Sequence, residues 1–222
     1  MRTTVTYLFD PLCGWCYGAS PVIQQLGQHK AFALELAPSD LFAGGGRTMD
    51  AAFADYAWSN DLRIAKLTGQ RFTEDYRSKV LGRHGSRFDS AAATLALTAV
   101  SLTEPQRELD ALKALQEARY VQGLDTCDMS MVEKLLRDQG LVAAANRLAS
   151  SDAELLAANA ARVQKAQGLM QTLGMQGVPA LVVTNDKGRR LLRGDVLYGS
   201  FDNLLSQMGA ASVQAGPVSF FR

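Results

Sequence analysis

The order of apolar and polar positions along the chain predicts an α/β fold that is interrupted by a run of helices. Residues 3–9 (TTVTYLF) are rich in β-branched and aromatic side chains, which is typical of a buried strand. Apolar residues then recur at helical spacing over residues 13–28, and residues 32–37 (FALELA) form a second short apolar run before Pro38. These segments predict a β-α-β unit, whose two strands run parallel with a right-handed crossover.

The middle of the chain, residues 48–151, shows helical periodicity and no strand pattern. Asp89 and Asp128 each stand directly before such a segment, so we expect both to be helix N-caps. The predicted helices span residues 50–67, 90–102, 105–122, 129–139 and 141–149.

The last part of the chain returns to mixed helix and strand. Residues 151–154 (SDAE) have the S-x-x-E form of a capping box, which predicts Ser151 as the N-cap of a long helix reaching about residue 173. Residues 180–184 and 189–193 flank a polar turn and predict an antiparallel hairpin. A final helix is expected over residues 201–208. The whole pattern indicates an α/β fold with a helical insertion.

The strongest chemical motif is Cys13-Gly14-Trp15-Cys16, at the junction of the first strand and the first helix. The free N–H groups and the positive dipole end of a helix N-terminus favour a thiolate over a thiol, so the position of Cys13 activates it as a nucleophile. Cys16 lies one turn further on and faces inward. We therefore expect Cys13 to attack a disulfide and Cys16 to resolve the mixed disulfide.

Two other interpretations of this C-x-x-C fit the sequence less well. A zinc site needs a second ligand pair, but Cys127, His29 and His84 are isolated in the sequence, so we expect no bound metal. A pair of inert core cysteines is disfavoured by Gly14 and Trp15, which separate them. Cys127 itself is interpreted as a bystander without redox function.

Charge and composition exclude several function classes. The net charge is +1 and no basic stripe is present, so we expect no nucleic-acid binding. No stretch is apolar and long enough to span a bilayer, and no signal-like apolar core precedes the first strand. The expected location is therefore cytoplasmic, where thiols are kept reduced and a C-x-x-C is more often catalytic than structural.

Residues 9–17 (FDPLCGWCY) resemble the active-site stretch of DsbA-like thioredoxin-fold oxidoreductases, particularly the FrnE-like branch without a secretory signal. Residues 177–180 (GVPA) resemble the cis-proline loop of that family. The resemblance implies a thioredoxin fold interrupted by an all-helical insertion domain. Residues 1–47 and 152–222 would form the thioredoxin-like domain, and residues 48–151 the insertion.

The resemblance suggests a role for the loop at Val178, and the positions of Trp15 and Asp10 next to the thiols suggest roles for these two residues. A cis bond between Val178 and Pro179 would let Val178 pair with an extended substrate peptide. Trp15 would form an apolar lip for substrate, or would pack against the helical block. Asp10 would accept a proton during resolution or cap the helix. At Gly14 the sequence departs from the FrnE-like branch, which usually has proline there.

These observations lead to a thiol–disulfide oxidoreductase that acts as a reductase or isomerase on protein or small-molecule disulfides. No bound cofactor is expected, and glutathione or a thioredoxin-type protein would serve as the reductant. Two alternatives stay open, a glutathione-dependent transferase or isomerase of the kappa-class type and a non-catalytic peptide-binding or chaperone module. The substrate, the direction of electron flow and the oligomeric state stay undetermined, although the aromatic tail at Phe220 and Phe221 would suit a contact between chains.

Overall fold

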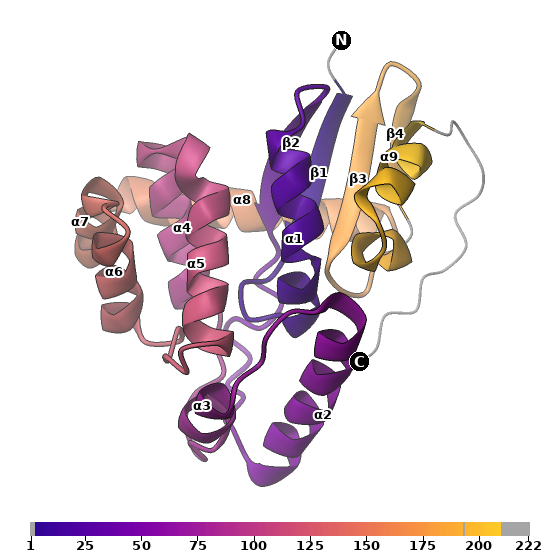
Figure 1. Cartoon of the computed structure of the whole chain (residues 1–222). Coiled ribbons are helices and arrows are strands. Elements are labelled where there is room, and N and C mark those ends of the chain that lie inside the picture. The colour runs from indigo at the N-terminus through magenta and orange to yellow at the C-terminus, as the bar shows by residue number, and fades with distance from the viewer. Residues whose placement is uncertain (1–2, 193, 210–222) are drawn as a thin grey trace.

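A mixed four-stranded sheet lies at the centre of the computed structural model, which describes residues 3–192 and 194–209 (Figure 1). The strand order is β2-β1-β3-β4, with β1 parallel to β2 and antiparallel to β3, and β3 antiparallel to β4. The predicted β-α-β unit and hairpin are confirmed, although the last strand is shorter than expected. The strands are β1 (Thr3–Phe9), β2 (Phe32–Pro38), β3 (Ala180–Asn185) and β4 (Gly188–Leu191).

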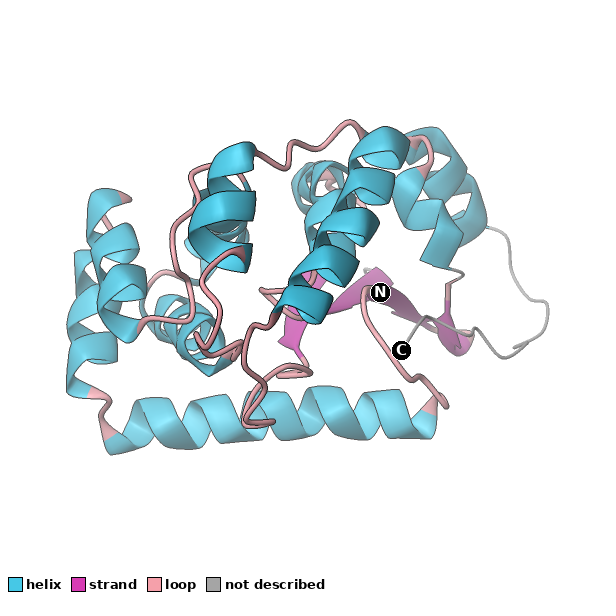
Figure 2. Ribbon diagram, turned by 90° about the horizontal axis from the view of Figure 1, so that it is seen from below, coloured by secondary structure: helices cyan, strands magenta, loops and turns pink. Residues whose placement is uncertain are grey.

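Helices cover both faces of this sheet. In Figure 1, α1 lies in front of the sheet and α8 lies behind it, and Figure 2 shows this long helix running alone along one side. The described helices are α1 (Gly14–Gln28), α2 (Ala51–Thr68), α3 (Glu74–Tyr76), α4 (Ala91–Thr103), α5 (Glu108–Tyr120), α6 (Met129–Asp138), α7 (Val142–Ser150), α8 (Ala153–Thr172) and α9 (Phe201–Gly209), with a π-helical turn η1 (Arg77–Leu81) and 3₁₀ turns η2 (Pro105–Arg107) and η3 (Gly194–Tyr198).

The helix N-termini show which of the predicted N-cap residues occupy the capping position. Asp128 caps α6 as predicted, because its carboxylate accepts hydrogen bonds from the backbone N–H groups of Ser130 and Met131. The prediction for Ser151 was wrong by one position. Asp152 caps α8 instead, and Ser151 ends α7 in the left-handed conformation, which the tight link between the two helices requires.

The cap predicted at Asp89 was also displaced. Ser90 occupies the N-cap position of α4 and makes no side-chain capping bond, while Asp89 accepts from the N–H of Ala91 at 3.0 Å. The Ser90 hydroxyl is used elsewhere, since it donates to the buried carboxylate of Asp10. Two short segments had no sequence signal, namely α3 with η1 and the turn η3 before α9.

The sheet and the inserted helices share one continuous hydrophobic core, which includes residues of β1, α1, α4 and α8. Arg162 on α8 connects these layers by donating to the carbonyl of Leu36 and the hydroxyl of Ser101, and by pairing with Glu108. The division into residues 1–47 with 152–222 and residues 48–151 stays a prediction. The core shows, however, that the two parts do not pack as separate units.

A second hydrophobic cluster lies beneath the loop that leads to the first cysteine. It is formed by buried aromatic and aliphatic side chains of α1, the inserted helices and that loop, and its aromatic rings pack edge-to-face and stacked. The buried members of this second cluster are Leu12, Tyr17, Met49, Tyr76, Val80, Leu81, Phe88 and Tyr120.

Among the described residues, no helix is long and apolar enough to cross a membrane. The aromatic tail residues Phe220 and Phe221 lie outside the described part of the chain.

Candidate active site

Cys13 occupies the N-cap of α1, where a capping oxygen usually lies. Its backbone is extended, with φ −82° and ψ 115°, and its sulfur accepts a hydrogen bond from the N–H of Cys16 at 3.4 Å. No acidic side chain lies in the first turn of α1, so none there competes for the free N–H groups. The helix N-terminus therefore stabilises negative charge on the Cys13 sulfur.

Cys16 differs from Cys13 in its exposure to solvent. Its side chain is fully buried, whereas Cys13 is 6% exposed, and both thiols are free. Burial, followed by the neighbouring Cys13 sulfur, raises the pKa of Cys16 well above its ordinary value. Both thiols are thus buried, and Cys16 is the more deeply sheltered of the two.

The loop at Val178 and Pro179 meets these thiols from the far end of the sequence. The Val178–Pro179 peptide bond is cis, and the Cys13 thiol donates to the Val178 carbonyl oxygen at 3.6 Å. Strand β3 places the loop there, because its first residue, Ala180, pairs with Leu8 near the end of β1. Two segments separated by 165 positions therefore converge at one edge of the sheet.

Asp10 is a fully buried carboxylate that lies behind the two thiols. Its oxygens accept hydrogen bonds from the N–H of Leu12 at 2.8 Å, the hydroxyl of Ser90 at 2.8 Å and the N–H of Phe42 at 3.1 Å. Asp10 does not cap α1, because the Cys13 sulfur holds that position. Burial outweighs the three hydrogen bonds and raises the pKa of Asp10 to about 6.

Trp15 is half-buried and packs against a residue that the sequence did not single out. Its ring meets that of Tyr198 edge-to-face at 5.2 Å, and the Tyr198 hydroxyl donates to the Trp15 carbonyl at 3.4 Å. Tyr198 belongs to η3, outside the helical block, and Trp15 also packs against the main hydrophobic core, which includes residues of the inserted helices. Both roles expected for Trp15 stay predictions. Tyr198 was missed because η3 has no periodic pattern.

Gly14 lies directly against a buried carboxylate on α2. A Cβ atom at this position would lie 2.5 Å from Oδ1 of Asp61, whose Oδ2 accepts a hydrogen bond from the Tyr76 hydroxyl at 3.0 Å. Burial raises the pKa of Asp61 to about 7. The close approach of Asp61 leaves no room for a side chain at this position without a shift of its neighbours.

Pro21 lies inside α1 and links the helix to the inserted helices. Because proline has no N–H, the carbonyl of Tyr17 lacks its usual helical donor. The side-chain amide of Gln70, which follows α2, donates to that carbonyl at 2.9 Å. The carbonyl that Pro21 leaves without a helical donor thus helps to attach the helical insertion to α1.

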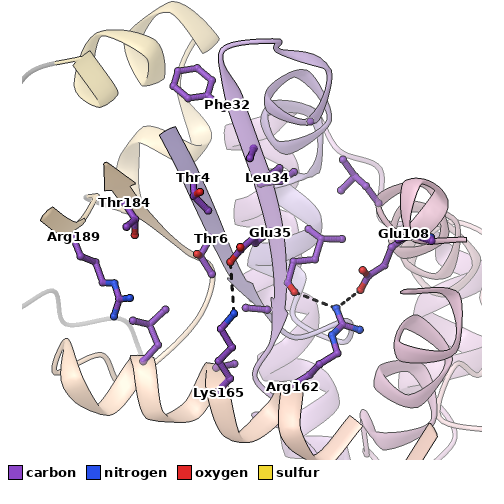
Figure 3. Close-up of a pocket in the computed structure, with 18 of the residues that line it drawn as sticks. Thr4, Thr6, Phe32, Leu34, Glu35, Glu108, Arg162, Lys165, Thr184 and Arg189 are labelled. Atoms are coloured by element: carbon purple, nitrogen blue, oxygen red, sulfur yellow. Dashed lines mark hydrogen bonds and ion pairs between the residues drawn. The ribbon is translucent and has the colours of Figure 1, made fainter. Parts of the chain in front are cut away.

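A groove of about 1090 Å³ lies away from the thiols, between β2, α5 and α8 (Figure 3). Lys165 faces Glu35 at 3.8 Å in this groove, and Arg162 pairs with Glu108. Neither cysteine of the C-x-x-C lines it. We therefore place the candidate site at the thiols and not in the groove.

The described residues contain no cluster of three potential metal ligands. Cys127 lies against the second hydrophobic cluster, where the guanidinium of Arg119 approaches its sulfur at 3.9 Å. Nothing in these contacts brings Cys127 to the C-x-x-C, and its bystander role stays a prediction.

A C-x-x-C at the start of the helix after the first strand, facing a cis-proline loop, defines a thioredoxin-fold disulfide oxidoreductase with a helical insertion. Residues 4–206 match the family of the DSBA-like thioredoxin domain. The chain belongs to this DsbA-like family of thiol–disulfide oxidoreductases.

Solved structures agree with this assignment. The chain is similar to the cytosolic disulfide reductase DsbM from Pseudomonas aeruginosa, with 29% identity and a TM-score of 0.81 over 92% of this chain and 98% of that one. A structure of DsbM with GSH gives the same identity and coverage with a TM-score of 0.78. A putative protein disulfide isomerase from Nitrosomonas europaea shares the fold, with 24% identity, a TM-score of 0.75 and coverage of 94% and 100%. No curated protein matches the chain.

Proposed function

We propose that this protein is a cytoplasmic disulfide reductase in which Cys13 is the nucleophile and Cys16 the resolving thiol. The observation that carries the proposal is the position of the Cys13 sulfur, which caps α1 and lies 3.6 Å from the Val178 carbonyl in the cis-proline loop. The similarity to DsbM, described as a cytosolic disulfide reductase, supports both the location and the direction of electron flow.

The reaction would proceed by two exchanges. The Cys13 thiolate attacks one sulfur of a substrate disulfide, a mixed disulfide forms, and the other substrate sulfur leaves as a thiolate that takes up a proton. Cys16 then loses its proton and attacks the Cys13 sulfur, which releases the second substrate thiolate. The substrate disulfide gains two electrons and becomes two thiols, while Cys13 and Cys16 become a disulfide.

Asp10 is the proposed acceptor for the Cys16 proton. Its carboxylate is fully buried in the loop that leads to Cys13, and burial raises its pKa to about 6. A group with this pKa is largely ionised at pH 7, so it accepts a proton, and it releases that proton again after the step. The residue that looked like a helix cap in the sequence is therefore assigned a role in proton transfer.

Substrate binding is assigned to Val178, Pro179 and Trp15. A cis-proline turn directs the Val178 backbone toward an extended peptide, which would add to the loop as a short strand. The exposed part of Trp15 would contact apolar side chains of that peptide. Two molecules of glutathione would reduce the Cys13–Cys16 disulfide and form glutathione disulfide, a role supported by the similarity to DsbM with GSH.

The test compares the wild type with Cys13→Ala, Cys16→Ala and the matched control Cys127→Ala. We expect Cys13→Ala to form no mixed disulfide with a disulfide peptide, Cys16→Ala to trap one, and Cys127→Ala to behave as wild type in mass spectra. In glutathione buffers, a reduction potential near about −270 mV indicates a reductase, and one between about −180 and −120 mV indicates an isomerase or oxidant. If no reversible Cys13–Cys16 disulfide forms, the proposed function is wrong.

A further inference from the structure

The peptide group between Leu12 and Cys13 is held at both ends by hydrogen bonds. Its N–H, which belongs to Cys13, donates to the carbonyl oxygen of Asp10 at 3.1 Å. Its carbonyl oxygen, which belongs to Leu12, accepts from the hydroxyl of Tyr120 at 2.7 Å. Leu12 is 3% exposed, so its buried carbonyl needs a partner from the protein. That partner comes from a residue 108 positions further along the chain.

Aromatic packing fixes Tyr120 in place. Tyr120 is the last residue of α5, is 1% exposed and belongs to the second hydrophobic cluster. Its ring stacks on Tyr17 with 4.9 Å between centroids, and it meets the rings of Phe72 and Tyr76 edge-to-face at 5.0 Å each. Burial raises the pKa of Tyr120 well above its ordinary value, so its hydroxyl keeps its proton and stays a donor. Helix α5 thus presents a fixed donor to the loop before Cys13.

The peptide group before Cys13 influences where the Cys13 sulfur lies. Cys13 is the N-cap of α1, and its sulfur accepts from the N–H of Cys16 and donates to the carbonyl of Val178. Rotation of the preceding peptide group would turn the Cα–Cβ bond of Cys13 and carry the sulfur away from both partners. A misplacement of about 1 Å at a reacting atom can cost about a hundredfold in rate. The nucleophile therefore depends on a firm hold at Leu12.

We propose that Tyr120 is a positioning residue, which holds the Leu12 carbonyl so that the Cys13 sulfur stays at the N-terminus of α1 for its attack on a disulfide. The inference rests on the proposed function and adds one residue to its first exchange. Tyr120 acts through the backbone of Leu12 and takes no part in bond making. Since α5 belongs to the inserted helices, the insertion helps to orient the nucleophile.

The first test measures the attack of Cys13 by itself, in the full chain with Cys16→Ala. Glutathione disulfide is added, the reaction is quenched with acid, and the mixed disulfide at Cys13 is followed by mass. We expect Tyr120→Phe in this background to form it about tenfold more slowly. Tyr17→Phe is the matched control, because Tyr17 stacks on Tyr120 but its hydroxyl lies near the backbone of Arg71. The control should react at the rate of Cys16→Ala alone.

The reduction potential separates positioning from a merely structural contact. A contact that only stabilises the fold acts equally on the reduced and oxidised proteins, so it leaves the potential of the Cys13–Cys16 pair unchanged. A hold on the Cys13 thiolate acts on the reduced protein, because in the disulfide this sulfur is fixed by its bond to Cys16. Tyr120→Phe should therefore disfavour the reduced form about tenfold in glutathione buffers, a shift of about 30 mV toward more negative potential.

Two results would contradict the proposals, and they are distinguishable. An unchanged attack rate together with an unchanged potential in Tyr120→Phe would overturn the assignment of Tyr120, even if the variant is less stable in urea. The proposed function would stand in that case, provided that Cys16→Ala still traps the mixed disulfide. Failure of Cys16→Ala to form any mixed disulfide would overturn both.

A second substitution covers the case in which Tyr120→Phe does not fold. Replacing Tyr120 by 4-aminophenylalanine keeps the ring and an N–H donor at the same position, but this donor is weaker than the phenol. The attack rate and the potential should both move in the direction expected for Tyr120→Phe, and by less. Values equal to those of the protein with Tyr120 would contradict the positioning role.

Discussion

Replacing Asp61 by asparagine should make the stability of the protein less dependent on pH. Asp61 is 5% exposed, and burial raises its pKa from the ordinary 3.8 to about 7, against the lowering effects of Tyr76 and Arg119. Such a shift disfavours the ionised carboxylate in the folded protein by about 4 kcal/mol, at about 1.4 kcal/mol for each pH unit. This is a large part of the 5–15 kcal/mol that typically stabilises a domain.

The direction in which stability changes with pH follows from proton binding at Asp61. Between pH 3.8 and about 7 the folded protein binds more protons at Asp61 than the unfolded chain does, so stability falls as the pH rises through this window. Above about pH 7 the wild type bears the full free-energy cost of the ionised, buried Asp61 carboxylate. Asparagine has nearly the same shape, accepts the Tyr76 hydrogen bond and carries no charge. The stability difference between Asp61→Asn and the wild type should therefore grow by about 3–4 kcal/mol from pH 4 to pH 8.

The assay is urea unfolding at unit steps of pH from 4 to 8, with the free energy of unfolding extrapolated to water. Asp55→Asn is the matched control, because Asp55 is an exposed aspartate on the same helix, α2. A stability difference for Asp61→Asn that stays constant with pH, or that shrinks as the pH rises, would refute the assignment of a buried, raised-pKa carboxyl at this position.

Two further predictions concern single contacts. Gly14→Ala should destabilise the protein by about 1–3 kcal/mol in urea unfolding, because the new Cβ would lie 2.5 Å from Asp61 Oδ1. The double variant with Asp61→Ala should recover part of that loss, and a fully additive loss would contradict the contact. Asp128→Ala should cost about 1 kcal/mol, because the N–H groups of Ser130 and Met131 lose their acceptor. Asp138→Ala, on the same helix, is the control. An unchanged urea midpoint for Asp128→Ala would show that the cap is not needed.

Much of the scaffold could be predicted from local pattern. Strand β1, helix α1 and the hairpin of β3 and β4 follow from side-chain periodicity and turn residues, which act over a few neighbouring positions. The two wrong predictions of helix N-caps were also local, since each was displaced by a single residue. Ser151 and Asp89 are good capping residues in isolation, but the linkers around them place the actual caps one residue further on.

The catalytic pair itself was also predictable, because both thiols belong to one short segment. Placing Cys13 at the start of a helix and Cys16 one turn inside it requires only the helical period. The loop at Val178 was expected from its resemblance to a family and not from the residues themselves. Its contact with Cys13 depends on the pairing of β3 with β1.

The sequence alone determined which atoms do the proposed chemistry, and the tertiary structure decided what surrounds them. Asp10 lost its expected capping role once Ser90 and Phe42, from distant parts of the chain, supplied its hydrogen bonds. Asp61 carries no motif, and it gains importance only because packing removes it from water beside Gly14 of the C-x-x-C. Burial changes the free energy of a charge or a hydrogen bond far more than neighbouring residues in sequence do, and burial is a property of the folded chain.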